Sequence, residues 1–580
     1  MSQPMRNSLT DPDAPASDSP DVVTKSYRGR EVFMESLIAH GVEYIFGNPG
    51  TTEMPIMDSL VDYPQVSYVL ALHESVALGA AHYYSQATGK TSVVNVHVGP
   101  GLGNTLGMLY NVWEANTPMV LTAGQQDTRM RLREPLLGHD LVAMAAPLTK
   151  WSVQAESADE LGHLLQRAFK IAADPPQGPV FVSLPLNVLE EETHNAAMAP
   201  GRLYARSAPD EEGLRAAADL LLAAKRPVAI IGDGVARSGA LREMVAISEM
   251  LGCRVFYEGL HHQISFPSSH PNFRDRMPFD YTGIRKALGD VDCILLVGGS
   301  FFEEIWFDEG SPFPSDARLI QIDASPQRLS LNFSPAVALL CDPRTGLSAL
   351  LDDLEERADQ AFRSAAEERN AASADERANE LAGQRQRARD TWDDSPISSA
   401  RLMAEIKAVA PSGTVIVNEA ITATGDLNRT LLFERTGDFY GTRGGGIGQA
   451  LPGALGVKIA HPDRPVIALS GDGSAMYSIQ ALWSAAHHDL PIVYIILHNR
   501  TYRILKLNMN IYRRRFGIAP DRPYPHMDLT EPDLDFVEMA RGMGVEGRRI
   551  TSPDEIGPAI ESALEKNVPY LLDVIIDGRI

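Results

Sequence analysis

Short apolar runs alternate with amphipathic, helix-like segments along most of this 580-residue chain, and this pattern constrains the fold more than any other feature. The runs TSVVNVHV (91–98) and PMVLTAG (118–124) are rich in valine and other apolar residues, which is typical of strands buried on both faces of a parallel sheet. The segment REVFMESLIAHG (30–41) instead places its apolar residues on one helical face. The alternation therefore predicts α/β domains built on doubly wound parallel sheets.

The alternation occurs in three blocks, which agrees with the usual domain size of about 100–200 residues. We place the domains at residues 25–195, 205–350 and 397–580. Residues 351–396 are charged, rich in alanine and poor in aliphatic side chains, so we interpret them as an exposed helical linker. The polar residues 1–24 indicate a disordered tail rather than a signal peptide.

The charge balance excludes several classes of partner. The chain has 52 Lys and Arg residues against 75 Asp and Glu residues, a net charge of −23. Nucleic acids and anionic membranes both need a basic face, so we expect neither as a partner. The sequence contains no run of 18 or more apolar residues, so we expect no membrane span. Three cysteines are too few for a disulfide framework. The composition predicts a cytoplasmic enzyme or binding protein.

The third block carries the strongest local motif. RPVIALSGDG (464–473) indicates a strand that ends in a glycine turn, and residues 474–497 provide a helix and a returning strand before HNRT (498–501). Neighbouring parallel strands bring both turns to one edge of the sheet. Glycines let the backbone approach a phosphate closely, and carboxylate, amide and carbonyl oxygens suit Mg²⁺. We therefore expect a metal–diphosphate site there.

This GDG…N pattern resembles the cofactor signature of thiamine-diphosphate enzymes, which usually ends in Asn-Asn; here His498 replaces the first Asn. The resemblance implies that Asp472, Asn499 and the main-chain carbonyl of Thr501 bind Mg²⁺. We interpret the earlier GDG at 232–234 as an ordinary turn, because residues 258–264 contain no Asn. The residues expected around the cofactor diphosphate are Gly471, Asp472, Gly473, Ser474, Asn499, Thr501 and Tyr502.

Two further segments match the same signature. SYVLALHESVALGAA (67–81) places Glu74 at a strand-to-helix junction, and the resemblance implies that this carboxylate shares a proton with the cofactor's aminopyrimidine and so activates it. The alternative is a carboxylate that only stabilises a helix N-terminus. TRGGGIGQALPGALG (442–456) resembles the segment that folds the cofactor into a V, with Ile447 between its rings and the Gly445 carbonyl at its amino group. Thr422 is expected at the diphosphate.

Within the superfamily, FGNPGTTEMP (46–55) and the long segment VNVHVGPGLGNTLGMLYNVWEANTPMVLTAGQQ (94–126) resemble the benzoylformate decarboxylase family. The resemblance extends from about residue 28 to 575 and is thinnest in the central block. It implies a pyrimidine-binding first domain, a central domain and a diphosphate-binding third domain. It also implies that Thr51 donates a hydrogen bond to a substrate carboxylate and that His97 moves protons.

Three positions depart from that family and bear on the substrate pocket. Ile305 stands where relatives carry a second active-site His, so that protonation step is expected to be absent. Ile504 stands where relatives with aromatic substrates tend to have a small residue, and Asn508 where an aromatic one is expected. The branched side chain of Ile504 predicts a narrower pocket that favours smaller, aliphatic acyl groups.

We therefore expect decarboxylation of a 2-oxo acid, carboligation to an aldehyde acceptor, or both, through an enamine intermediate. An acetolactate-synthase-like or benzaldehyde-lyase-like reaction is the alternative, because an enamine that is slowly protonated survives to attack an aldehyde or oxo acid. Acetolactate synthases often bind a flavin against the central domain. The sequence therefore leaves open whether FAD binds in addition to thiamine diphosphate and Mg²⁺.

Two other classes of function fit less well. A nicotinamide-dependent oxidoreductase would need G-x-G-x-x-G and a following acidic residue, but VNVHVGPGLGN (94–104) has G-x-G-x-G and no such residue. A non-catalytic cofactor-binding paralogue would need neither Glu74 nor His97. The resemblance further implies a cofactor site between the first domain of one chain and the third of another, and hence a homodimer or homotetramer.

Overall fold

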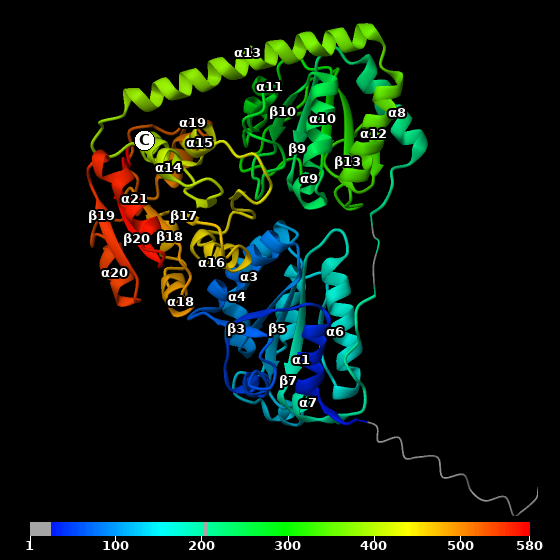
Figure 1. Cartoon of the computed structure of the whole chain (residues 1–580), viewed down its shortest axis with the longest axis vertical. Helices are drawn as coiled ribbons and strands as arrows, with labels where there is room; N and C mark the ends of the chain where they lie inside the picture. Colours follow the sequence, from blue (N-terminus) through cyan, green and yellow to red (C-terminus); the bar gives the residue numbers. More distant parts are fainter. Residues whose placement is uncertain (1–24, 202–203, 205) are drawn as a thin grey trace, which may run out of the picture.

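The computed structural model describes residues 25–201, 204 and 206–580; the tail predicted for residues 1–24 lies outside them. Three α/β domains follow one another along the chain, and each is built on a six-stranded sheet (Figure 1). All strand pairs in these three sheets are parallel. The predicted fold class is therefore confirmed.

In the first domain the sheet has the order β3-β2-β4-β5-β7-β6. Strands β4 and β5 are buried at every residue, as their continuous apolar sequence predicts. A two-stranded antiparallel pair, β1 (Tyr27–Arg28) with β8 (Glu192–Thr193), joins the two ends of the domain. The main elements are α1 (Gly29–Ala39), β2 (Tyr44–Asn48), β3 (Ser67–Leu70), α3 (Glu74–Thr88), β4 (Ser92–Val96), α4 (Val98–Glu114), β5 (Met119–Gln125), β6 (Ser152–Gln154), α6 (Ala158–Ala173) and β7 (Pro179–Pro185).

The central domain has the sheet order β11-β10-β9-β12-β13-β14. Successive strands extend first to one side of β9 and then to the other, so the strand order reverses between β9 and β12. In doubly wound sheets the crevice at this point is the usual place for ligands and polar side chains. The main elements are α8 (Glu211–Ala223), β9 (Pro227–Ile231), α9 (Asp233–Ser238), α10 (Leu241–Leu251), β10 (Arg254–Tyr257), β11 (Phe273–Arg276), α11 (Tyr281–Leu288), β12 (Cys293–Val297), β13 (Arg318–Asp323), β14 (Val337–Leu340) and α12 (Pro343–Arg357).

The third domain has the sheet order β16-β15-β17-β18-β20-β19. The strand that ends at the GDG turn, β17, pairs in parallel with β18, which ends at His498. Both predicted turns therefore lie at the same edge of this sheet. The main elements are α14 (Ser399–Val409), β15 (Val415–Glu419), α15 (Thr424–Thr430), β16 (Phe439–Tyr440), α16 (Ala450–Ala460), β17 (Val466–Gly471), α17 (Asp472–Ala475), α18 (Ala481–His487), β18 (Val493–His498), α19 (Arg503–Arg515), α20 (Phe536–Gly542), β19 (Glu546–Ile550), α21 (Ile556–Glu565) and β20 (Tyr570–Ile575).

A 31-residue helix, α13 (Gln360–Asp390), runs along the outside of the molecule from the central to the third domain (Figure 1). It is more than an exposed linker, because one face docks on the central domain: Arg274 donates to Ser373 Oγ at 2.8 Å, and Arg377 donates to the Ser268 carbonyl at 2.8 Å. In the part of the chain that the structure describes, no helix is long and apolar enough to cross a membrane.

The first and third domains share one hydrophobic core, in which α3 packs on α16. Small residues permit the close approach of these helices. A Cβ added to Gly456 would lie 2.0 Å from the Ala80 carbonyl oxygen, and one added to Gly79 would lie 2.8 Å from Pro452. Tyr83 then donates from its hydroxyl to the Gly441 carbonyl at 2.8 Å. The contact places the segment after Gly441 beside the first domain of the same chain.

Replacement of Gly456 by Ala tests this close approach. The added methyl group meets backbone atoms that cannot rotate away, so we expect a loss of about 1–3 kcal/mol of stability, measured as a lower midpoint of urea unfolding. Gly383→Ala in α13 is the matched control, because its Cβ meets only the tip of Arg387 at 3.9 Å. That change should raise stability by about 0.5–1 kcal/mol. Equal effects of the two changes would contradict the packing argument.

Candidate active site

A cavity of about 550 Å³ lies where β15, β17 and β18 end in the third domain. Its wall is formed by the turn after each strand and by the glycine loop, which we define as Gly444–Gly448. The structure thus brings together every cofactor-binding residue predicted in this domain. The predicted residues that line the cavity are Thr422, Gly445, Ile447, Gly471, Asp472, Gly473, Ser474, Asn499, Thr501, Tyr502 and Ile504.

Asp472 connects the two turns at the base of the cavity. It is 2% exposed, and its Oδ1 accepts the N–H of Gly473 at 2.8 Å. Its Oδ2 accepts the N–H of Arg500, which follows β18, at 2.6 Å. Burial raises the pKa of Asp472 above its ordinary value. A buried carboxylate with free lone pairs beside an amide oxygen is a donor set that suits a hard divalent cation.

The other predicted metal ligands are held close by. Asn499 Oδ1 accepts the N–H of Thr501 at 3.0 Å, and Thr501 donates from its hydroxyl to the Met527 carbonyl at 2.7 Å. The turn between them needs a left-handed residue, Arg500, at φ +60°. These bonds fix the orientation of both residues, so the chain builds a rigid set of oxygen ligands from two strand ends.

Two glycines of the cavity leave space for a ligand next to the backbone. A Cβ on Gly471 or Gly445 would meet no atom within 4 Å, and Gly445 has φ +82°. Gly473 is glycine for a different reason, because a Cβ there would lie 2.4 Å from the Tyr502 ring. The open backbone beside Asp472 fits a diphosphate that approaches main-chain N–H groups.

Glu419 is a functional residue that the sequence analysis missed. This last residue of β15 is 2% exposed, and its carboxylate accepts the N–H groups of Gly448 at 2.6 Å and Ala450 at 2.9 Å. Burial raises the pKa of Glu419 to about 7. It ties the end of the glycine loop to the sheet. Its place at the end of a buried strand, three residues before Thr422, was the available signal.

Glu74 occupies the strand-to-helix junction that was predicted for it. It is the first residue of α3 and 8% exposed. Its Oε2 accepts from the Asn104 side chain at 2.9 Å. A Cβ on Gly101 would lie only 3.3 Å from the other carboxylate oxygen, Oε1. Helix α4 therefore fixes this carboxylate from one side.

His97 lies at the N-terminus of α4 and is held by Glu53, a second residue that the sequence analysis missed. His97 Nδ1 is 2.7 Å from Glu53 Oε2 and 3.2 Å from Thr52 Oγ1. Glu53 is fully buried and also accepts the N–H groups of Gly50 at 2.9 Å and Gly124 at 2.8 Å. With Nδ1–H donating to this carboxylate, Nε2 is left available. Both Thr52 and Glu53 belong to the segment that carried the resemblance.

The remaining predicted residues lie elsewhere. Thr51 is exposed, and the hydroxyl that contacts His97 belongs to Thr52. Asn508 lies one turn beyond Ile504 on α19, and Ile305 is 58% exposed on the segment after β12. Five predicted site residues do not line the third-domain cavity of their own chain: Thr51, Glu74, His97, Ile305 and Asn508.

Known protein families match three parts of the chain. Three families match it: the N-terminal thiamine pyrophosphate binding domain over residues 27–144, the central domain of these enzymes over 214–350, and the C-terminal thiamine pyrophosphate binding domain over 422–574. All three descriptions are of thiamine pyrophosphate enzymes.

Relatives of similar length also match. Benzoylformate decarboxylase of Pseudomonas aeruginosa is 32% identical over 550 residues, which cover 93% of this chain and 97% of that protein. Acetolactate synthase isozyme 3 large subunit of Escherichia coli is 26% identical and covers 95% of each chain. The structure of a thiamine diphosphate-dependent 4-hydroxybenzoylformate decarboxylase of Rhodococcus jostii superposes with a TM-score of 0.81 at 29% identity, over 95% of this chain and 99% of that one. The predicted resemblance is confirmed: this chain belongs to the thiamine-pyrophosphate-dependent enzyme family.

Proposed function

We propose that the protein uses thiamine diphosphate and Mg²⁺ to decarboxylate a 2-oxo acid. The observation that carries this proposal is the cavity in which Asp472, Asn499 and Thr501 from two strand ends face the open backbone of the glycine loop. The 32% identity to a benzoylformate decarboxylase supports the reaction class. When bound, thiamine diphosphate supplies the carbon that adds to the substrate and takes up the electrons left by carbon dioxide.

The chain's own residues perform the other tasks. Asp472 and the side chain of Asn499, with the Thr501 carbonyl, would hold Mg²⁺, and the cation offsets the charge of a diphosphate in a protein with a net charge of −23. The open backbone at Gly471 would let main-chain N–H groups of this turn approach the phosphates. Ile447 projects from the glycine loop into the cavity wall and supports the cofactor rings.

Glu74 and His97 require a second subunit in this proposal, because neither lines the cavity of its own chain. Large apolar side chains are exposed near both halves of the site: Leu72 beside Glu74 is 48% exposed, and Tyr477 at the cavity is 58% exposed. A symmetric homodimer, alone or within a homotetramer, would cover these side chains and bring the first domain of one chain over the cavity of its partner. Glu74 then holds a proton at the pyrimidine.

His97 is proposed to move a proton at Nε2. Its Nδ1 is bonded to the buried Glu53 carboxylate at 2.7 Å, and this contact stabilises the charged imidazolium when Nε2 gains a proton. The geometry orients the ring in the same way as a catalytic triad orients its His.

A carboligase is the second candidate, and the exposed Ile305 favours it. An aliphatic side chain where relatives carry a His supplies no proton, so transfer to an aldehyde acceptor would compete with protonation. The 26% identity to an acetolactate synthase supports the same reading. The half-buried Ile504 in the cavity wall favours small acyl groups in either reaction.

The first prediction concerns Glu74. Glu74→Gln keeps the shape of the side chain but removes its ability to share a proton, so turnover should fall at least about 100-fold. Carbon dioxide release and product analysis over 2-oxo acids from pyruvate to benzoylformate, with and without an aldehyde, measure this. Glu211→Gln is the matched control, because Glu211 is also the first residue of a helix but is far from the site. A Glu74→Gln variant that turns over at the wild-type rate would rule out this mechanism. A hydroxyketone product from the wild-type protein with added aldehyde would identify a carboligase.

A second prediction concerns the support of His97. Glu53→Gln places an amide group against backbone N–H donors and weakens the contact to Nδ1. We expect about 1–3 kcal/mol lower stability, a kcat reduced about 10- to 100-fold, and an altered tautomer of His97 in nitrogen NMR spectra. Glu43→Gln changes an exposed carboxylate of the same domain and should leave all three quantities unchanged. An unaltered His97 tautomer in Glu53→Gln would count against the orienting role.

A third prediction concerns substrate size. Ile504→Ala enlarges the cavity wall and should shift the ratio of kcat/KM for benzoylformate over pyruvate upward by about 10-fold or more, since about 1–3 kcal/mol of discrimination is available from such contacts. Leu340→Ala, at an exposed position of the central domain, is the control. An unchanged ratio would show that Ile504 does not set the size limit.

A further inference from the structure

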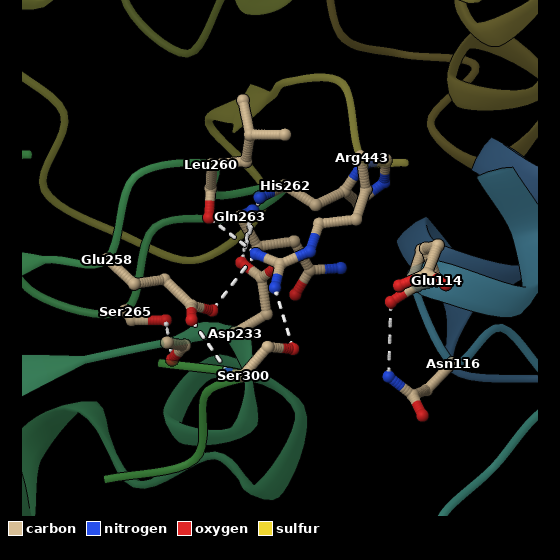
Figure 2. Close-up of polar contacts among 12 residues, drawn as sticks. Glu114, Asn116, Asp233, Glu258, Leu260, His262, Gln263, Ser265, Ser300 and Arg443 are labelled. Atoms are coloured by element: carbon tan, nitrogen blue, oxygen red, sulfur yellow. Dashed lines mark hydrogen bonds and ion pairs between the residues drawn. The ribbon is translucent and has the colours of Figure 1, made fainter. Parts of the chain in front are cut away.

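Arg443 directly precedes the glycine loop, yet its side chain lies in the central domain. The side chain is 3% exposed. All the carboxylates that it pairs with belong to the central domain, at the crevice between β9 and β12. Figure 2 shows two of them, Asp233 and Glu258, beside Arg443. A single side chain of the third domain therefore occupies the place where the strand order of the central sheet reverses.

The guanidinium makes contacts on every side. Its Nη1 donates to Glu258 Oε1 at 2.9 Å and to the Leu260 carbonyl, and Nη2 donates to Ser300 Oγ at 3.2 Å. Its Nε is 3.2 Å from Glu303 Oε1, and Nη1 is 3.6 Å from Asp233 Oδ2. Such an array uses the planar geometry of arginine and could not be reproduced by lysine.

The central domain holds two of these carboxylates in place by its own backbone. Glu258 Oε2 accepts the N–H of Ser300 at 2.8 Å. Asp233 Oδ1 accepts the N–H groups of His262 at 2.8 Å and Gln263 at 3.1 Å (Figure 2). A Cβ on Gly232 would lie 2.4 Å from Glu258 Oε1. The GDG segment at 232–234 is thus not an ordinary turn but part of the site that holds the Arg443 guanidinium. We call this site the seat and define it as Asp233, Glu258 and Glu303.

The seat carries more negative charge than one arginine balances. Three carboxylates, Asp233, Glu258 and Glu303, surround Arg443, and Glu114 of α4 also faces Glu303. Burial and these neighbouring carboxylates raise the pKa of Glu303 to about 7 against the opposing effect of Arg443. Loss of the guanidinium would leave Glu258 buried without its ion-pair partner, and Asp233 would keep Arg237 as its remaining arginine neighbour.

The rest of the glycine loop is held by different groups. Glu419 accepts the N–H of Gly448 at 2.6 Å, and Asn111 of the first domain accepts the N–H of Gly446 at 3.0 Å. The Gln449 side chain donates to the Arg443 carbonyl at 3.0 Å. At the start of the loop, the Arg443 side chain and the Gly441 N–H, which donates to the His262 carbonyl at 2.9 Å, tie the chain to the central domain. All three domains therefore fix the loop at separate points.

We propose that Arg443 is a positioning residue that anchors the start of the glycine loop to the central domain and so holds Gly445 and Ile447 ready for the cofactor. The effect on cofactor binding rests on the proposed function, but the anchoring itself is a property of the cofactor-free chain. Arg443 acts through the loop and does not itself line the cavity. Because anchoring is completed before binding, its loss should weaken cofactor affinity more than the rate of the bound enzyme.

The test compares Arg443→Met, Arg443→Lys and the wild-type full chain. In Arg443→Met we expect hydrogen exchange over residues 441–449 of the cofactor-free protein to be at least tenfold faster. The Kd for thiamine diphosphate in excess Mg²⁺, from calorimetry, should rise at least tenfold, with kcat at saturating cofactor within twofold of wild type. Arg443→Lys, which keeps the charge, should recover part of the affinity. Arg401→Met is the matched control, since Arg401 is an equally buried, ion-paired arginine of the third domain.

The outcomes separate this inference from the proposed function. Wild-type exchange of residues 441–449 in Arg443→Met, or an equal rise in Kd in Arg401→Met, would overturn the anchoring role. If Arg443→Met does not fold, Glu258→Gln replaces it in the test. This change weakens the same seat and should also speed hydrogen exchange over residues 441–449 and raise the Kd for thiamine diphosphate. If wild-type protein failed to bind thiamine diphosphate at all, the proposed function would be lost, while the exchange measurement would still decide whether Arg443 anchors the loop.

Discussion

Strands that are apolar on both faces must be covered by helices on both sides, and this requirement governs where polar chemistry can lie in the protein. Each of the three sheets is parallel, so every connection crosses over and the carboxyl ends of the strands meet at one edge. A charged side chain inside a sheet needs a partner: buried Asp573 of β20 lies 2.9 Å from His498 Nδ1 and accepts from Arg549. In the third domain the GDG turn, the HNRT turn and Thr422 consequently gather at one edge, although they are separated by long stretches of chain.

Buried charges at these edges are held mainly by backbone N–H groups. Asp472, Glu419 and Glu53 each accept two or more hydrogen bonds from nearby residues, which lowers the cost of taking a carboxylate out of water. For Glu419 the compensation is incomplete, since burial still raises its pKa to about 7. A side chain fixed in this way has little rotational freedom. The site residues that they support, His97 and the glycine loop, are therefore preorganised.

The glycine loop shows how the domains cooperate. Arg443, which directly precedes the loop, is paired in the central domain. Within the loop, Gly446 donates to Asn111 of the first domain and Gly448 donates to Glu419 of the third. The close packing of α3 on α16, permitted by Gly79 and Gly456, keeps the first domain near enough for the Asn111 contact. A loop of flexible glycines thus gains its rigidity from three surrounding surfaces rather than from its own sequence.

By itself the sequence determined the three α/β domains, because strand burial and helix periodicity are local patterns. They can be recognised in a short segment without knowing which other segments pack against it. It also determined that the GDG and HNRT turns lie together, since two turns after adjacent parallel strands must share an edge. Only the tertiary structure decided that Glu53 orients His97, that Glu419 holds the glycine loop, and that Asp233 and Glu258 form a seat for Arg443. Those partners are separated by 44, 29 or 31, and 185 residues in the sequence. Their pairing depends on how crossover connections and domain contacts place strand ends in space, which no local pattern of residues specifies.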